Sequence, residues 1–232
     1  MPYRRLPKTD VARLRALKVV LGNNDIYTVR NRVVDWQILN RCQPAYDRLF
    51  TACQQYNICM AAQKRKTAQI DRLQHNATIY LSHFIQVLLM SMERGEIKAK
   101  NKELYGLAID DNAVPNIKSA EAVISWGQKI VEGEKTRIKN GGLQIFNPTI
   151  GKVATHLDIF TEAYNDQKSK QQQTAKALAE VQKLRPETDE ILLELWNQIE
   201  KHFAAEPPEV RFAECRKLGL VYYYRRKEEH LY

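Results

Sequence analysis

The stretch from residue 147 to residue 203 constrains the fold most strongly, because its apolar residues recur at helical spacing over most of its length. Alternating steps of three and four residues place apolar side chains on one side of a helix, and that side must be buried against another element. The first part of this stripe consists of Ile150, Val153, Leu157, Phe160 and Tyr164. The spacing continues through the polar residues Gln167, Gln171 and Thr174, and apolar positions resume at Leu178. The stretch therefore predicts an amphipathic helix with a polar middle.

Two prolines mark the predicted ends of helices in this stretch. Asn147 is a favourable N-cap residue, and Pro148 fits the first helical position, where an N–H group is not needed. Pro186 predicts a break and a restart. A second stripe follows it, at Leu192, Trp196, Ile199 and Phe203. The whole stretch therefore predicts a helical hairpin that buries one face.

The first half of the chain carries a similar pattern. Thr9 or Asp10 is expected to cap a short helix that ends at Gly22. A second helix is expected to begin between Asp25 and Thr28. Its apolar stripe continues without interruption through Leu39, Cys42, Tyr46, Leu49, Cys53, Tyr56 and Met60.

Breaks are also predicted within this first half. Pro44 predicts a kink or a junction between two helices, and the polar run 63–67 predicts a turn. A third helix is then expected to end at Gly95, with an inward face made of Ile70, Leu73, Ala77, Leu81, Phe84 and Leu88.

The segments that follow the two hairpins are shorter. Residues 96–118 are expected to form a loop with one extended piece at 104–109. Ser119 or Glu121 should begin a helix that closes at residues 140–142. Pro208 should open a brief helix to Lys217, and residues 220–224 have the composition of a strand.

Four short matches in chain order predict an internal duplication. Residues 96–98 match 209–211, and residues 106–109 match 219–222, both at an offset of 113. Residues 18–22 match 129–133, and residues 45–46 match 163–164, at offsets of 111 and 118. Chance similarity between amphipathic helices is the alternative explanation.

We therefore predict an all-α fold, a helical bundle built from two duplicated helical-hairpin halves about a pseudo-twofold axis. Residues 1–110 form the first repeat and residues 111–232 the second, packed as one domain. The extended pieces 104–109 and 220–224 occupy equivalent places in the two repeats and are expected to pair as a minor two-stranded ribbon.

Composition favours a soluble helical protein. The chain has 232 residues and only nine glycines, and no run of apolar residues approaches the length of a membrane span. With no signal-type leader, we expect a cytoplasmic protein. The four cysteines, Cys42, Cys53, Cys59 and Cys215, show no C-x-x-C spacing. Cys42 and Cys53 fall on the apolar stripe, which favours a core role over a metal or redox site.

The positive charge is unevenly distributed along the chain. Residues 1–110 contain 18 Lys and Arg against 9 Asp and Glu, whereas residues 111–232 contain 18 of each. This asymmetry favours an anionic partner, such as nucleic acid or another polyanion. A solvated basic surface is the alternative, since no known nucleic-acid-binding motif accompanies the charge. The candidate polyanion-binding residues are Lys64, Arg65, Lys66, Lys98, Lys100, Lys102, Arg225 and Arg226.

The sequence contains no local motif for catalysis or cofactor binding. The Glu-x-x-His pair of di-iron bundles is absent, and Gly141 and Gly142 end a helix instead of opening a phosphate loop. We therefore predict no cofactor, no metal and no catalytic residue, although a site assembled from distant residues stays open. The polar layer of Gln167, Gln171 and Thr174 either lines a pocket between helices or belongs to a helix that projects into solvent.

The opening residues 2–10, P-Y-R-R-L-P-K-T-D, together with the duplicated helical plan, resemble uncharacterised all-helical proteins of Bacteroides-type bacteria. The resemblance covers the whole chain. It implies a bacterial, intracellular, all-helical protein, and it implies no activity and no site residue.

Taken together, these patterns favour a non-enzymatic helical scaffold or partner-binding protein, with an unknown protein as its partner. The alternative is nucleic-acid or polyanion binding through the basic first half. A third possibility is an enzyme or ligand carrier with a pocket between the two half-bundles.

Overall fold

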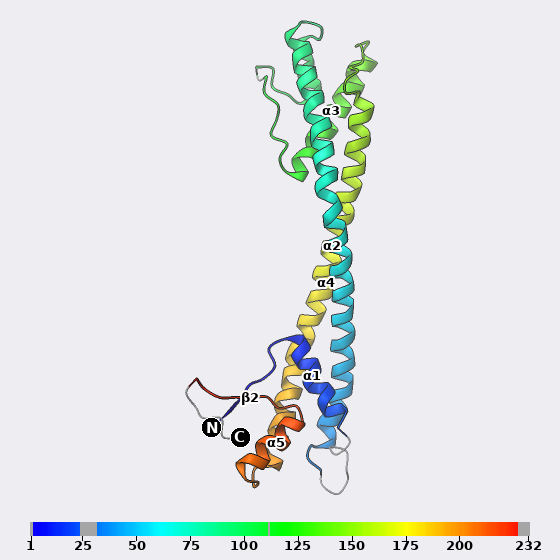
Figure 1. The fold of residues 1–232 in the computed structure, drawn as a ribbon. Helices are drawn as coiled ribbons and strands as arrows, with labels where there is room; N and C mark the ends of the chain where they lie inside the picture. Colours follow the sequence, from blue (N-terminus) through cyan, green and yellow to red (C-terminus); the bar gives the residue numbers. More distant parts are fainter. Residues whose placement is uncertain (1, 24–31, 111, 227–232) are drawn as a thin grey trace. The chain divides into compact units, whose positions relative to one another are not determined.

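The computed structural model describes residues 2–23, 32–110 and 112–226, and it is all-α apart from one short two-stranded ribbon (Figure 1). Two long helices dominate the chain, and shorter elements precede, separate and follow them. The order of elements is β1 (Tyr3–Arg4), α1 (Asp10–Leu21), α2 (Trp36–Glu93), the 3-10 helix η2 (Ala99–Tyr105), α3 (Ala120–Lys139), α4 (Ile150–His202), α5 (Pro208–Lys217) and β2 (Tyr222–Tyr223).

The chain divides into two compact units. Unit 1 comprises Met1–Met60 with Gln173–Tyr232, and unit 2 comprises Ala61–Gln172. Helices α2 and α4 contribute a segment to each unit. Each unit therefore contains residues from both predicted repeats, and each chain half begins with a short helix followed by a long one. The internal duplication stays a prediction.

Unit 1 has a core formed by four helices. Its segments of α2 and α4 run antiparallel, and ion pairs join Arg41 to Glu190 and Arg48 to Glu187. α1 and α5 cover this pair, so that side chains from all four helices share one apolar core. Its buried residues include Leu17, Val20, Ile38, Leu39, Ile191, Leu195, Trp196 and Ile199. The predicted stripes of both long helices are therefore confirmed in this unit.

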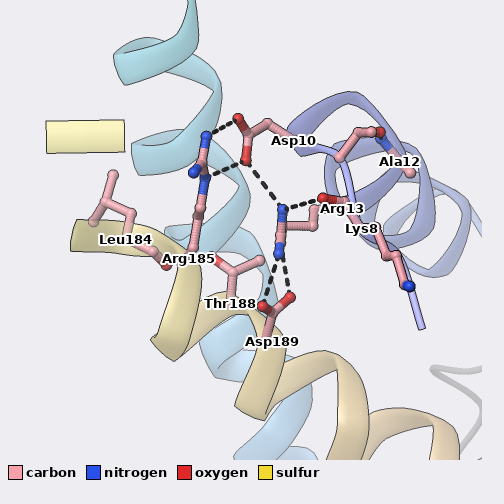
Figure 2. Close-up of polar contacts among 9 residues, drawn as sticks. Lys8, Asp10, Ala12, Arg13, Leu184, Arg185, Thr188 and Asp189 are labelled. Atoms are coloured by element: carbon pink, nitrogen blue, oxygen red, sulfur yellow. Dashed lines mark hydrogen bonds and ion pairs between the residues drawn. The ribbon is translucent and has the colours of Figure 1, made fainter. Parts of the chain in front are cut away.

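A network of ion pairs fixes α1 to α4 (Figure 2). The guanidinium of Arg13 donates from Nε and Nη2 to the two carboxylate oxygens of Asp189, at 2.7 and 2.8 Å. Arg185 donates in the same two-bond manner to Asp10, at 2.9 and 2.8 Å. Arg13 Nη1 also donates to Asp10 and to the carbonyl of Lys8, both at 3.2 Å. These paired bonds set both the position of α1 and the path of the segment before it.

The start of α1 agrees with the sequence. The Thr9 hydroxyl accepts a hydrogen bond from the Ala12 N–H at 3.2 Å, and Gly22 closes the helix by donating to the Lys18 carbonyl at 3.0 Å. Ser119 caps α3 in the same way, with its hydroxyl accepting from the Ala122 N–H at 3.1 Å. Both predicted caps are confirmed.

The ribbon has a different partner strand from the one predicted. β2 pairs antiparallel with β1, with Tyr3 opposite Tyr223 and Arg4 opposite Tyr222. The predicted partner, 104–109, begins inside η2, whose C-cap residue Gly106 is left-handed with φ of 69°. The side chain of Tyr105 in that segment is buried and donates to Glu134 of α3. The pairing of residues 104–109 with 220–224 is therefore wrong.

Unit 2 is built on the other segments of the two long helices. They also run antiparallel, with Lys66 paired to Asp166 at 2.9 Å and the ring of Tyr80 stacked on His156 at a centroid distance of 4.1 Å. α3 and η2 cover this pair. α3 approaches η2 closely at Gly133, where a Cβ would lie only 2.6 Å from the Leu104 carbonyl oxygen.

The predicted breaks at the run 63–67 and at Pro186 are wrong, and so is a junction between two helices at Pro44; the alternative of a kink at Pro44 stays a prediction. α2 continues through Pro44 and through the run 63–67, and α4 continues through Pro186. Both prolines are exposed, as are the residues four positions earlier, Asn40 and Gln182, whose carbonyls lose a helical partner. Water is therefore available to those carbonyls, and the apolar stripes on the opposite face keep each helix intact. The predicted helix start at Asp25–Thr28 lies outside the described residues.

Helix α4 begins slightly later than expected. Its first residue is Ile150, and the Thr149 carbonyl accepts from the Lys152 N–H at 3.0 Å. Asn147 and Pro148 therefore lie in the preceding turn, and the expectation that they cap and open the helix is wrong.

The polar layer of α4 faces a polar part of α2. Gln167 Nε2 donates to Thr67 Oγ1 at 3.2 Å, so this part of α4 does not project alone into solvent. Gln171 is exposed, whereas Gln167 and Thr174 are half-buried. The polar run 63–67 of α2 therefore lies beside the polar layer of α4.

Replacing Pro186 or Pro44 by alanine should stabilise the protein. Alanine restores the missing N–H and removes the clash with the preceding turn, so each change should raise the free energy of unfolding by about 1–3 kcal/mol. Urea denaturation followed by circular dichroism measures this. E180A, at an exposed position of the same helix, is the control and should leave the midpoint unchanged. A lower midpoint for P186A would show that the proline shapes the helix in a way that the core requires.

Candidate functional site

Unit 2 contains a groove of about 870 Å³, which lies between the end of α2, η2 and the segment that follows α3. We call it the α3-loop groove. Its apolar lining consists of Val87, Ile97, Leu104, Leu143, Ile145 and Phe146.

A buried polar network lies beneath this groove. The Arg137 guanidinium donates to the two carboxylate oxygens of Glu134, at 2.8 and 2.7 Å. Tyr105 donates its hydroxyl hydrogen to Glu134 at 2.5 Å and accepts from Arg137 Nε at 3.0 Å. Burial, followed by the hydrogen bond to Glu134, raises the pKa of the Tyr105 hydroxyl above its ordinary value. The hydrogen bond to Glu134 likewise raises the pKa of Arg137, so the guanidinium keeps its charge inside the fold.

The same arginine holds the loop that forms one side of the groove. Arg137 Nη2 donates to the Leu143 carbonyl at 2.6 Å, and the Arg137 carbonyl accepts from the Gly142 N–H at 3.0 Å. Gly141 supplies a left-handed residue with φ of 88°. Gly142 leaves room for the guanidinium, since a Cβ there would lie 2.5 Å from Arg137 Nη1. The backbone after α3 is therefore anchored from below.

This anchored loop exposes two large apolar side chains. Leu143 is 88% exposed and Phe146 is 77% exposed, the highest values among the exposed large hydrophobic residues of the described chain. Hydrophobic residues are common on protein surfaces one at a time, but a pair beside an apolar groove is typical of an interface. The arrangement is suited to binding.

The charges at the groove are few. Glu96 lines it but is paired with Arg94 at 2.6 Å, and Arg137 is paired with Glu134. Lys98 also lines the groove and is exposed. The groove therefore presents a net positive rim.

Within unit 2, the structure does not gather the predicted polyanion-binding residues on one surface. Lys64, Arg65 and Lys66 are exposed on α2, and Lys66 is paired with Asp166 at 2.9 Å. Lys98 and Lys100 are exposed beyond the end of the same helix, about 45 Å away at 1.5 Å per residue.

The remaining predicted residues lie elsewhere. Lys102 is buried, and its Nζ donates to the Ile109 carbonyl at 2.7 Å and to Asn112 Oδ1 at 2.6 Å, so it serves the fold. Arg225 and Arg226 are exposed and belong to unit 1. Unit 1 contains 20 Lys and Arg against 15 Asp and Glu, and unit 2 contains 16 against 12. The positive charge is therefore shared between the units.

The cysteines have the environment of core residues. Cys42 and Cys215 are fully buried, Cys53 and Cys59 are half-buried, and all four are free thiols. Burial raises the pKa of the Cys42 thiol to about 11, which suppresses the reactive thiolate. The described residues contain no cluster of three or more His, Cys, Asp or Glu side chains that would hold a metal.

Leu143 and Phe146 were not identified from the sequence, because they lie outside any periodic pattern. The available signal was a Gly-Gly pair at a helix end followed by the apolar residues of Leu-Gln-Ile-Phe. Apolar side chains within a turn cannot belong to the apolar stripe of a helix. Their presence in a turn is the local sequence signal for an exposed apolar surface.

Comparison with known proteins defines no family. The chain matches no protein-family model, no curated protein and no solved structure. Within the described ranges, no helix combines the length and the apolar character that crossing a bilayer requires.

Replacing Glu134 by alanine should destabilise unit 2. The change leaves the Arg137 cation buried without its partner, which costs about 3–5 kcal/mol of unfolding free energy. E96A breaks the solvent-exposed pair with Arg94 and should leave the urea midpoint nearly unchanged. Equal effects of the two substitutions in urea denaturation would contradict a structural role for the buried network.

The thiols should divide into two classes by access. In the native protein at pH 8, Ellman's reagent should modify Cys53 and Cys59, whereas Cys42 and Cys215 should react only after unfolding in urea. The double variant C53S/C59S should therefore be unreactive until denaturant is added. Rapid labelling of that variant under native conditions would show that the core of unit 1 opens readily.

Proposed function

We propose that this chain is a non-enzymatic binding protein that holds a protein partner in the α3-loop groove. One observation carries the proposal: Leu143 and Phe146 are almost fully exposed, yet they stand on backbone fixed by Arg137. An exposed apolar pair is costly for a free surface because water must surround it, and burial under a partner removes that cost.

The fixed backbone keeps Leu143 and Phe146 exposed, and it also favours high affinity for a partner. Binding requires loop and side-chain ordering, which reduces the free energy of association. The bonds from Arg137 to the Leu143 carbonyl and from Gly142 to the Arg137 carbonyl order the loop before a partner arrives. Leu143 and Phe146 would then act as anchors, and the apolar lining of the groove would receive side chains of the partner.

The charges favour a different protein over a second copy of this chain. Lys98, Lys100 and Lys139 are exposed at or near the groove, and unit 2 carries more basic than acidic residues. Two copies would bring these like charges together. A partner segment that combines apolar side chains with a carboxylate near Lys98 is complementary to the groove. Polyanion binding has weaker support, because the exposed basic residues are dispersed.

The partner can be captured by a photo-crosslinking amino acid placed at position 146 in cells that produce the protein, followed by mass spectrometry. The same crosslinker at position 58, whose native Ile58 is 62% exposed in unit 1, is the matched control. A protein crosslinked from position 146 and absent from the control is then purified for binding measurements. Adducts formed only between copies of this chain, or only with nucleic acid, would contradict the proposal.

The double variant L143S/F146S should weaken binding of the purified partner by about 30-fold or more, since anchor residues contribute roughly 2 kcal/mol or more. Its unfolding free energy should change by no more than about 0.5 kcal/mol, because both side chains face solvent in the free protein. The control I58S should bind like the wild type. Equal weakening by I58S, measured by isothermal titration calorimetry, would place the interface elsewhere.

A further inference from the structure

The α3-loop groove carries polar side chains of one chemical kind along its apolar lining. Four carboxamides line it: Asn101, Asn140, Gln144 and Asn147. Asn101 is half-buried and the other three are exposed. Within the described ranges, none of the four side-chain amides forms a hydrogen bond with another group of the protein. Each amide therefore keeps its N–H donors and its carbonyl acceptor for a ligand.

The backbone beside these amides also has a main-chain group without a protein partner. The Leu143 carbonyl accepts from Arg137 Nη2 at 2.6 Å, which holds the peptide group that joins Leu143 to Gln144. This peptide bond is trans, so the Gln144 N–H points away from the Leu143 carbonyl and from the arginine that binds it. Neither the N–H nor the carbonyl of Gln144 forms a hydrogen bond with the described part of the chain.

These unpaired groups distinguish between two forms of a partner segment. A helix satisfies its main-chain N–H and carbonyl groups internally, so a groove that receives a helix needs little besides apolar side chains. An extended segment instead leaves its main-chain groups to external partners. A carboxamide offers a donor and an acceptor together, and these complement the N–H and the carbonyl of a peptide group. The groove is therefore better suited to an extended segment than to a helical one.

The charge at the groove adds a further requirement to that segment. Lys98 lines the groove, is exposed, and has no ion pair within the described chain. Glu96 is the one carboxylate among the described lining residues, and it is paired with Arg94 at 2.6 Å. A carboxylate on the bound segment is therefore complementary to Lys98.

We propose that the α3-loop groove binds an extended peptide segment, whose main chain pairs with the groove carboxamides and with the Gln144 peptide groups. Apolar side chains of the segment lie against Leu143 and Phe146, and a carboxylate lies near Lys98. The main-chain bonds supply affinity, whereas the apolar contacts select the side chains. This inference rests on the proposed function and specifies the form of the partner.

The probe is a phage-displayed library of random 12-residue peptides. The library is first depleted on L143S/F146S and then selected on the wild-type protein, so that enriched peptides require the two apolar anchors. We expect enriched peptides to combine apolar residues with Asp or Glu. A synthetic copy of the strongest peptide is then compared, by isothermal titration calorimetry, with analogues in which one main-chain N–H at a time is replaced by an ester oxygen.

Ester replacement should weaken binding by about fivefold at alternate positions of the bound peptide. Successive N–H groups of an extended segment point to opposite sides, and one net hydrogen bond contributes about 1 kcal/mol. Losses at successive positions, as in a helix, or no loss above twofold at any position would overturn the proposal.

Protein variants test the other side of the same bonds. Q144A should weaken binding of the parent peptide by about fivefold, and it should have less effect on an ester analogue that has already lost the same bond. Q128A removes an exposed carboxamide of α3 that does not line the groove, and it should bind like the wild type. Equal effects of Q144A and Q128A would contradict a role for the groove amides.

The outcomes separate this inference from the proposed function. If no peptide is enriched, or if a glycan array shows oligosaccharide binding that L143S/F146S abolishes, the assignment of an extended peptide is overturned. The proposed function is judged separately, by crosslinking from position 146 and by the effect of L143S/F146S on the captured protein.

Discussion

The fold depends on the pairing of two long helices that each carry one apolar stripe. Two helices alone cannot enclose a core, because every stripe side chain keeps one edge in water, so further elements must cover the pair. α1 and α5 provide this cover in unit 1, and α3 with η2 provides it in unit 2. Charge also attaches α1 to α4, through Arg13 and Arg185, whereas Arg137 of α3 joins that helix to η2 by donating to the Tyr105 hydroxyl.

The α3-loop groove lies where α3 ends and the chain leads away from it. In both units an arginine of a covering helix also donates to a loop carbonyl, Arg137 to Leu143 and Arg13 to Lys8. The interactions that stabilise the fold therefore also order the surfaces available for binding.

The sequence is enough to predict the helices, but it is not enough to predict the binding surfaces. Stripes and caps such as Thr9 are local features, so the all-α class and most helix positions follow from them. Pro186 does not break α4 and Pro44 does not divide α2, because the cost of a proline depends on which side of the helix faces water, which only the packing decides. The ribbon partner and the exposure of Leu143 depend on contacts between distant segments, and no periodicity records those contacts.

We propose that the loop carrying Leu143 and Phe146 is ordered before any partner binds. The most direct measurement is ¹⁵N relaxation of the backbone amides of these two residues in the free protein, with α3 as the internal reference. We predict order parameters close to those of the helix, about 0.85. Values below about 0.6 would show a flexible loop and would contradict it.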